Sequence, residues 1–262
     1  MTVTDVDKHR TEDYAAAETR LRRELAAVYR LVAHFKMTDL IYNHISARLP
    51  GPEHRFLLNP YGLLYEEITA SSLVIVGLDG ELVTDGPWRV NPAGFVIHGA
   101  IHAARDDALC VLHTHTKAGC AVAAQEHGLL PLNQMSLEFY DRVAYHDYEG
   151  IALSNAERER LVADLGAKPV MILRNHGLLT VGKTPGQAFL RMFYLERACE
   201  IQVDALAGGA PVVTPPPEVC ERTARQFEGD RSGDDYGLTG TPELAWNAML
   251  RLVERVAPDY KN

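Results

Sequence analysis

The chain has 262 residues, of which 47% are hydrophobic, so it can bury a substantial core, and a single domain of this size is ordinary. Its formal net charge of −9 argues against a nucleic-acid-binding surface, which needs a basic stripe. The sequence has no apolar run long enough to span a membrane and no secretory signal, and its four cysteines lack CxxC spacing. We therefore expect a cytoplasmic protein with neither nucleic acid nor membrane as partner.

The first half of the chain is predicted to contain a long helix, several strands and a second helix. Residues 1–11 are expected to be frayed. The long helix is indicated by apolar residues at helical spacing, which are Leu21, Leu25, Val28, Val32 and Phe35. Strands are predicted at 55–58, 73–78 and 81–84. Asn91 and Pro92 are typical of a helix N-terminus, so the second helix is expected to run from there to Arg105.

The second half alternates strands and helices. Strands are predicted at 110–112, 143–145 and 169–173. Helices are predicted over 117–124, from a capping box at 154–157, and from a cap at Thr184 to Ala207. This interleaving predicts an α/β fold, and because some strands form hairpins, the sheet is expected to be mixed.

The stretch from 208 to 241 differs from the rest because it is rich in proline and glycine and mostly lacks apolar periodicity. A last helix is predicted from Thr241, with Trp246 on its apolar face. Two readings stay open for residues 208–262. They form an arm that docks its helix onto a neighbouring subunit, or a flexible connector to a helix docked on its own chain.

Three histidines carry the chemistry that the sequence predicts. His113 and His115 follow a buried strand, and residues two apart on a strand point to the same side. His176 comes just after the apolar strand at 169–173. Three neutral imidazoles from two strand ends make a divalent-metal site, and three protein ligands leave a position open, as in catalytic sites. For an isolated HxH pattern, hydrogen-bonded histidines at a core edge are an equally good reading.

The surrounding residues resemble the class II aldolase/adducin family. The matching segments are 42–48, 58–62, 73–80, 91–98, 113–115 and 174–182. The resemblance implies that His113, His115 and His176 are the metal ligands. It also implies a domain over residues 12–207, a central mixed β-sheet flanked by helices on both faces, and a homotetramer with active sites at subunit interfaces.

Two signatures of the family's sugar-phosphate aldolases are changed in this chain. Those enzymes carry a glutamate that ligates the metal and transfers a proton, and Gly94 stands in its place. Hydroxyl groups that bind the substrate phosphate are also missing, because Tyr61-Gly62 and Ala93-Gly94 replace serine-containing pairs. A dianionic phosphate needs several donors, so we expect a substrate without phosphate.

Several other residues are candidates for binding or proton transfer. The resemblance implies substrate contacts from Asn43, Asn59, Tyr61, Gly62 and Gly94, and Lys117 is a candidate anchor for an anionic group, although a solvated lysine is more common. The family's tyrosine acid, which the adjacent subunit supplies, suggests Tyr140, chosen over Tyr145 and Tyr148. His98 is the second candidate for proton transfer, and a packing role beside His102 is its alternative.

These observations predict a lyase that depends on one divalent metal per subunit, Zn²⁺, Mn²⁺ or Fe²⁺. Its small-molecule substrate is a hydroxy-carbonyl or hydroxy-acid compound, cleaved at a C–C bond by an aldol or decarboxylation step. One alternative is an Fe(II) non-haem oxygenase acting on an aryl hydroxy or keto acid. Another is a non-catalytic, adducin-like interaction module. That module would gain little from an open three-histidine site, because structural metals normally have four protein ligands.

Overall fold

The computed structural model describes residues 3–51, 53–78, 80–91, 94–150, 155–229 and 241–262. Its centre is a seven-stranded sheet in the order β3-β2-β1-β4-β7-β6-β5. The strands are β1 (Ile45–Arg48), β2 (Phe56–Leu58), β3 (Val74–Val76), β4 (Cys110–Thr114), β5 (Val143–His146), β6 (Val170–Leu173) and β7 (Gly177–Gly182). Only β5 and β6 pair in parallel, so the expected mixed sheet is confirmed.

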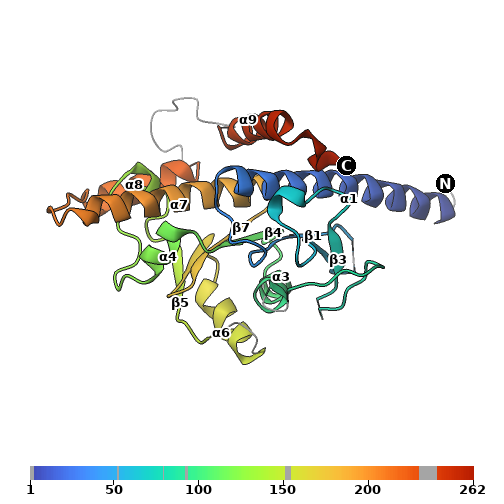
Figure 1. Ribbon diagram of the computed structural model, residues 1–262, viewed down its shortest axis with the longest axis horizontal. Helices are drawn as coiled ribbons and strands as arrows, with labels where there is room; N and C mark the ends of the chain where they lie inside the picture. The colour runs from blue at the N-terminus through green and yellow to red at the C-terminus, as the bar shows by residue number, and fades with distance from the viewer. Residues whose placement is uncertain (1–2, 52, 79, 92–93, 151–154, 230–240) are drawn as a thin grey trace.

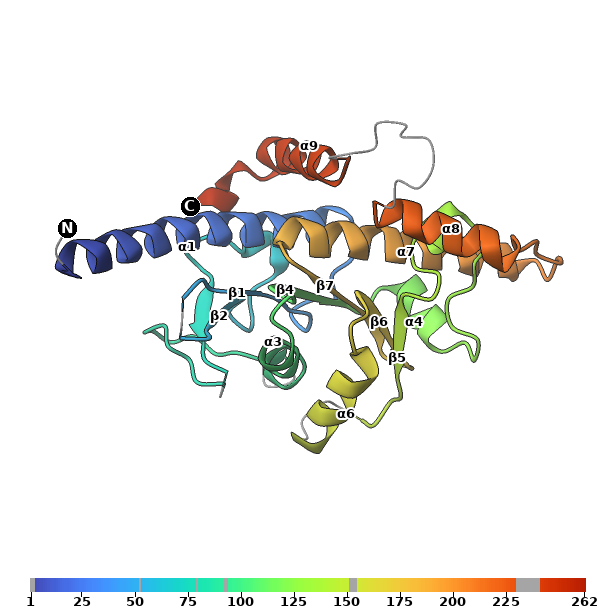
Figure 2. The same ribbon diagram turned by 180° about the vertical axis from the view of Figure 1, so that it is seen from behind.

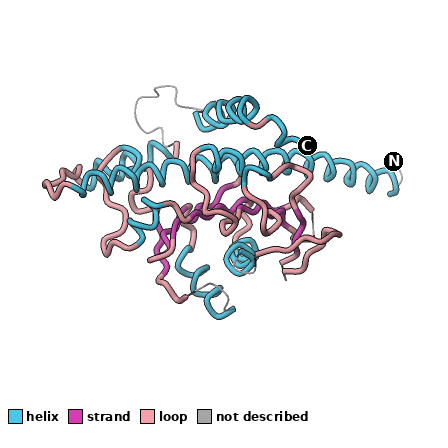
Figure 3. Tube along the Cα trace, viewed as in Figure 1, coloured by secondary structure: helices cyan, strands magenta, loops and turns pink. Residues whose placement is uncertain are grey.

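Helices cover both faces of the sheet, as Figures 1 and 2 show from opposite sides. One face lies under α1 (Val3–His34) and α7 (Pro185–Ala207), with α4 (Lys117–Ala123) and α5 (Gln134–Leu137) beside α7. The other face lies under α3 (Ala100–Ala104), its preceding π-helical turn η2 (Phe95–Gly99), and α6 (Asn155–Leu165). Figure 3 shows the strands as a layer between these two sets of helices.

Alternation along the central strands divides the core between the two faces. Cys110 and Leu112 of β4 join a large cluster with the apolar sides of α1 and α7. Val111, between them, joins a smaller cluster under α3 and α6. Because side chains alternate along a strand, His113 also faces the α3/α6 side, while Thr114 faces α7 and bonds Met192. The metal-ligand candidates therefore start from the less apolar face.

The C-terminal segment docks on its own chain. After α8 (Pro217–Phe227), α9 (Thr241–Val256) packs against α1 and α7, and Trp246 fills the space over Gly186, where an added Cβ would meet the indole at 2.5 Å. The final turn η3 (Pro258–Lys261) is fastened by an Arg30–Asp259 ion pair of 2.7 Å. The last helix of the segment therefore has contacts with two long helices of its own chain.

Several predictions about the elements need correction or lie outside the described residues. The first helix begins at Val3, so residues 3–11 of the segment expected to be frayed are helical. The strand expected at 81–84 is reduced to one bridge, from Leu82 to Val76, and helix α8 lies within the stretch that mostly lacks apolar periodicity. The short turn η1 (Tyr65–Glu67) and strand β1 were not predicted. Pro92 and Ser154, from the two predicted helix starts, lie outside the described residues.

Candidate metal centre

The three histidines meet where β4 ends beside the start of β7. His113 lies in β4, His115 follows it directly, and the antiparallel register sets His113 opposite Leu179. His176 occupies the tight turn between β6 and β7, after Asn175 in the left-handed region at φ 56°. Hairpin and register together deliver side chains that are 61 residues apart in sequence to one point.

Gly177 allows this close approach. A Cβ at position 177 would lie 2.3 Å from the carbonyl oxygen of Thr114, closer than any real contact. The absence of a side chain thus lets the chain after His176 pass directly over the end of β4. The glycine in the Asn175-His176-Gly177 motif is explained by this packing.

The ring nitrogens converge on one point. His115 Nε2 lies 2.8 Å from His113 Nε2 and 2.9 Å from His176 Nε2, and the potential ligand atoms of all three residues lie within 4.8 Å of one another. Among the described residues, this group of metal-binding side chains contains no carboxylate. An ion held here would have three protein ligands and at least one open coordination position.

Hydrogen bonds at the far side of two rings fix which nitrogen is free. His113 Nδ1 donates to the carbonyl oxygen of Leu178 at 2.8 Å, and His115 Nδ1 donates to the carboxylate of Asp39 at 2.9 Å. In the neutral rings both Nε2 atoms then carry lone pairs that face each other at 2.8 Å. Such an arrangement is repulsive without a cation, so these residues fit a divalent metal.

The surroundings of His113 and His176 favour the neutral form of these two rings. Burial, with smaller contributions from His115 and His146, lowers the pKa of His176 to about 4. Burial also holds the pKa of His113 well below its usual value, and the neighbouring histidines add to this effect. A neutral imidazole is the form that binds metal ions.

Asp39 is a functional candidate that the sequence reading missed. It lies in the connection between α1 and β1, 76 residues before His115, and no local pattern marks it. Its carboxylate orients His115 and raises the basicity of the ligand. A second missed group is the buried Glu196 of α7, which accepts a hydrogen bond from Thr116, directly after the HxH segment.

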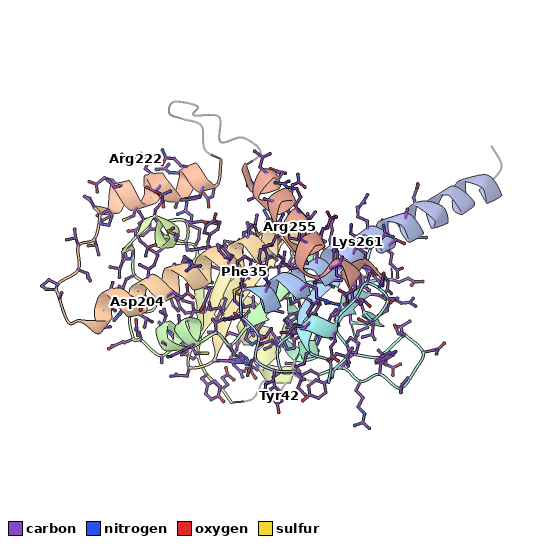
Figure 4. The ribbon with its side chains drawn as sticks, turned by 45° about the horizontal axis from the view of Figure 1, so that its top comes forward. Phe35, Tyr42, Asp204, Arg222, Arg255 and Lys261 are labelled. Atoms are coloured by element: carbon purple, nitrogen blue, oxygen red, sulfur yellow. The ribbon has the colours of Figure 1, made fainter. Side chains whose placement is uncertain are left out.

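The predicted substrate residues differ in burial and in whether their polar atoms are hydrogen-bonded. Asn43 is 1% exposed, and neither its amide nitrogen nor its oxygen has a hydrogen-bond partner, which is a costly arrangement unless a ligand or water completes it. In contrast, the side-chain oxygen of Asn59 accepts a hydrogen bond from the Tyr29 hydroxyl at 2.9 Å. Tyr61 is half-buried, and Gly62 is exposed at φ +107°, a conformation suited to glycine. Tyr42, just before Asn43, lies on the side of the molecule away from Arg255 (Figure 4).

His98 and Gly94 lie on the helix side of the site. His98 is fully buried, its Nδ1 lies 2.7 Å from the Ser46 hydroxyl, and its Nε2 has no partner among the described residues. Gly94 is buried, and an added Cβ there would meet the His44 ring at 2.3 Å. The structure therefore puts an imidazole in the space next to the position of the absent glutamate.

The tyrosines considered as proton donors differ in the contacts that they make. Tyr148 lies beside the histidines, with its ring centroid 6.4 Å from that of His176, and both residues line one small cavity. The hydroxyl of Tyr145 is already hydrogen-bonded, because it accepts a hydrogen bond from the backbone N–H of Leu129 at 3.1 Å. Tyr140 follows α5 and makes no ring contact with the histidines among those described. Lys117 is exposed on α4. Of these three tyrosines, Tyr148 is therefore the one with a described ring contact to the histidines within the same chain.

A seven-stranded mixed sheet with helices on both faces and a histidine cluster at a strand end defines a class II aldolase-like α/β fold. The Class II Aldolase and Adducin N-terminal domain matches residues 23–203, and the chain belongs to this family. A crystal structure of an aldolase II superfamily protein from Pseudomonas syringae shares 51% identity, covers 94% of this chain and 96% of its own, and superposes with a TM-score of 0.86.

Other relatives point in two directions. A Caulobacter vibrioides protein, provisionally named a class 2 aldolase, is 52% identical over 93% of each chain. An L-fuculose 1-phosphate aldolase from Glaciozyma antarctica is 26% identical, covers 95% of this chain and 94% of its own, and has a TM-score of 0.79. Mouse alpha-adducin is 48% identical over 80% of this chain, which matches 29% of the adducin.

No helix in the described part of the chain is long and apolar enough to cross a membrane.

Proposed function

We propose that the chain is a divalent-metal-dependent carbon–carbon lyase acting on a non-phosphorylated hydroxy-carbonyl or hydroxy-acid substrate. The observation that carries this proposal is the convergence of three imidazole Nε2 atoms with no carboxylate among them. An ion bound there would supply Lewis-acid stabilisation of negative charge on a substrate oxygen. Membership of the class II aldolase family supports a metal-dependent lyase.

The residues of the chain divide the remaining tasks. His113, His115 and His176 hold the ion, and the carboxylate of Asp39 and the carbonyl of Leu178 keep two of the rings oriented. Tyr148 is the candidate donor of a proton to the product, because it is the tyrosine beside His176. We propose it in place of Tyr140.

Decarboxylation is the reaction that best suits position 94. Glycine cannot abstract a proton, and loss of CO₂ breaks a C–C bond and leaves the electron pair on the substrate without needing a base. Tyr61-Gly62 and Ala93-Gly94, in the place of the serine-containing pairs that bind phosphate in the family's aldolases, support a substrate without phosphate. Asn43, with two buried unpartnered polar atoms, is the candidate contact for a substrate oxygen.

Metal content and turnover test the proposal together. The protein is purified without oxygen, its metal is measured, and CO₂ and aldehyde release are followed with 2-hydroxy, 3-hydroxy and 3-keto carboxylates and with the phosphorylated counterparts. We expect turnover of unphosphorylated compounds only, lost on treatment with a chelator and restored by metal. Full activity of the metal-free protein contradicts the proposal, and oxygen uptake by an iron-loaded protein assigns it instead to an oxygenase.

A non-catalytic role is the second candidate, and the 48% identity to mouse alpha-adducin favours it. For an interaction module we expect no turnover and no dependence of its assembly on metal.

We propose that the chain forms a homotetramer whose sites lie at subunit interfaces. Light scattering coupled to size-exclusion chromatography measures the mass of the assembly with and without the ion. A monomer that retains turnover contradicts the interface site.

A further inference from the structure

His44 occupies the space into which a side chain at position 94 would extend. An ideal Cβ at Gly94 would lie 2.3 Å from His44 Cδ2 and 2.8 Å from His44 Nε2. Nothing larger than hydrogen fits at position 94 unless the imidazole moves. The edge of the ring that carries Nε2 is thus directed at the position where a longer side chain would start.

The ring of His44 lies between the helix side of the site and the histidine cluster. Its centroid is 4.4 Å from that of His98, edge to face, and 5.6 Å from that of His113. The residue is 2% exposed. His44 does not belong to the group of side chains that can share an ion, which among the described residues consists of His113, His115 and His176. It is therefore a neighbour of the centre and not a fourth ligand.

A chain of hydrogen bonds fixes the ring against which His44 packs. His102 Nδ1 donates to the carbonyl of Ala108 at 2.9 Å, so its Nε2 accepts from the Ser46 hydroxyl at 2.7 Å. The oxygen of Ser46 in turn accepts from His98 Nδ1 at 2.7 Å. His98 Nε2 is then a bare acceptor, and it has no partner among the described residues. This order of donors and acceptors fixes the orientation of the His98 ring, against which His44 packs.

Unpartnered buried atoms distinguish this corner from ordinary packing. His44 Nδ1, His98 Nε2 and both polar atoms of the Asn43 side chain are buried and have no hydrogen-bond partner in the described part of the chain. A buried polar atom that is left unpaired lowers stability, so an apolar side chain would serve a purely structural role better. Because the ring of His44 lies between those of His98 and His113, the unpaired nitrogens of His44 and His98 point to a molecule bound beside the histidine cluster.

We propose that His44 takes over the place of the absent side chain at position 94 and contacts a hydroxyl or carbonyl oxygen of the metal-bound substrate, with Gly94 required to make room for it. This inference rests on the proposed function, because it needs an ion at the histidine cluster. In this arrangement a neutral hydrogen-bonding imidazole stands where relatives are expected to carry a carboxylate. The site then favours a substrate that is held by hydrogen bonds and does not require a strong base.

The first test measures packing and needs neither metal nor substrate. Gly94→Ala is introduced into the wild type and into His44→Ala, and thermal unfolding is followed for all four proteins. We expect Gly94→Ala to lower Tm by about 5 °C in the wild type, as overpacking does, and to cost much less once His44 is truncated. Gly208→Ala is the control, because a Cβ there meets nothing within 4 Å. Equal losses in both backgrounds overturn the pairing of His44 with Gly94.

The second test measures the contact with a bound molecule. Co²⁺-loaded protein is titrated with acetohydroxamate, a chelator that presents two adjacent oxygens, and the change in the cobalt spectrum gives Kd. We expect His44→Leu to retain its cobalt and bind acetohydroxamate about tenfold more weakly, and His44→Gln to recover part of the loss. The exposed His127→Ala is the control and should behave as wild type.

The outcomes separate this inference from the proposed function. Wild-type protein that takes up no cobalt overturns both. Full cobalt with unchanged hydroxamate affinity in His44→Leu overturns the role of His44 alone. If His44→Leu does not fold, His44→Gln together with the Gly94 pair decides the question.

Discussion

The two faces of the sheet treat buried polar groups differently. Under α1 and α7, polar side chains are paired within the protein: Thr180 bonds Ala188, Gln202 bonds Gly128, and Arg30 bonds Ile68. Under α3 and α6, in contrast, His44, His98 and His146 each have a buried ring nitrogen with no hydrogen-bond partner among the described residues, although His146 Nε2 lies 3.8 Å from a carboxylate oxygen of Glu157. The exceptions on the first face, in the part of the chain that the structure describes, are the hydroxyl of Tyr65 and the amide nitrogen of Asn133, which caps α5 beside α7.

This difference indicates how the fold separates stability from chemistry. The α1/α7 face holds the large apolar cluster, and its helices are long enough to bury many side chains against the sheet. The α3/α6 face has shorter helices, and buried imidazoles take the place of part of its apolar packing. Groups that are costly for folding lie on the face where a ligand can offset the cost.

The largest expected effect comes from breaking the histidine cluster on the second face. His176→Ala removes one of three ligands, so we expect metal occupancy below about a tenth of the wild-type value, and loss of turnover with it. Metal analysis after gel filtration measures the occupancy, and His127→Ala is the matched control. Wild-type occupancy in His176→Ala contradicts the assignment of the metal centre.

Truncation on the first face should affect stability and leave metal binding in place. Phe189 is fully buried and contacts the rings of Phe35 and Trp246, so Phe189→Ala is expected to lower the free energy of unfolding by about 3–5 kcal/mol. Urea denaturation measures the change, and Phe227→Ala, at a side chain that is 46% exposed, serves as control. Loss of metal by folded Phe189→Ala at low temperature would show that the two faces are not independent.

Asp39→Asn tests a group at the edge of the centre. The amide keeps the size of the side chain but removes the negative charge that orients His115, so metal affinity should fall about 10–100-fold without a large change in stability. Competition with a chromophoric chelator gives the affinity. Asp204→Asn is the control, since Asp204 is exposed at the far end of α7 (Figure 4). Equal affinities of Asp39→Asn and wild type remove Asp39 from the metal centre.

The smallest effect is expected from a charged group packed beside the first face. Burial raises the pKa of Glu138 to about 7 from its ordinary value of 4.5, and Arg191 partly opposes this shift. The native protein therefore holds one more proton than the unfolded chain between these two pKa values, so the contribution of Glu138 to stability is lost as pH rises through 7. Glu138→Gln should reduce the fall in unfolding free energy between pH 5 and pH 8.

Urea denaturation at the two pH values measures this difference, because the other titrating groups are common to both proteins. The exposed Glu218→Gln serves as the control. An identical pH dependence in Glu138→Gln and wild type shows that Glu138 is not desolvated as the structure describes.

Local patterns predicted the elements that present the metal ligands. The alternation of Val111, His113 and His115 indicated one side of a strand, and the apolar run before His176 indicated a hairpin. Thr184 caps α7 as its sequence indicated, with its hydroxyl accepting from the backbone of Gln187. Strand β1 escaped prediction because its four residues are too short to show a period.

By itself, the sequence determined the alternation of side chains along strands and helices, the likeness to the aldolase family, and the absence of a carboxylate at position 94. Only the tertiary structure decided that Asp39 supports His115, that Tyr148 lies beside His176, and that His44 fills the space above Gly94. The physical reason is the range of the interactions. Periodicity and capping act over a few residues, whereas these contacts join segments that are brought together only by the pairing of strands and the docking of helices on the sheet.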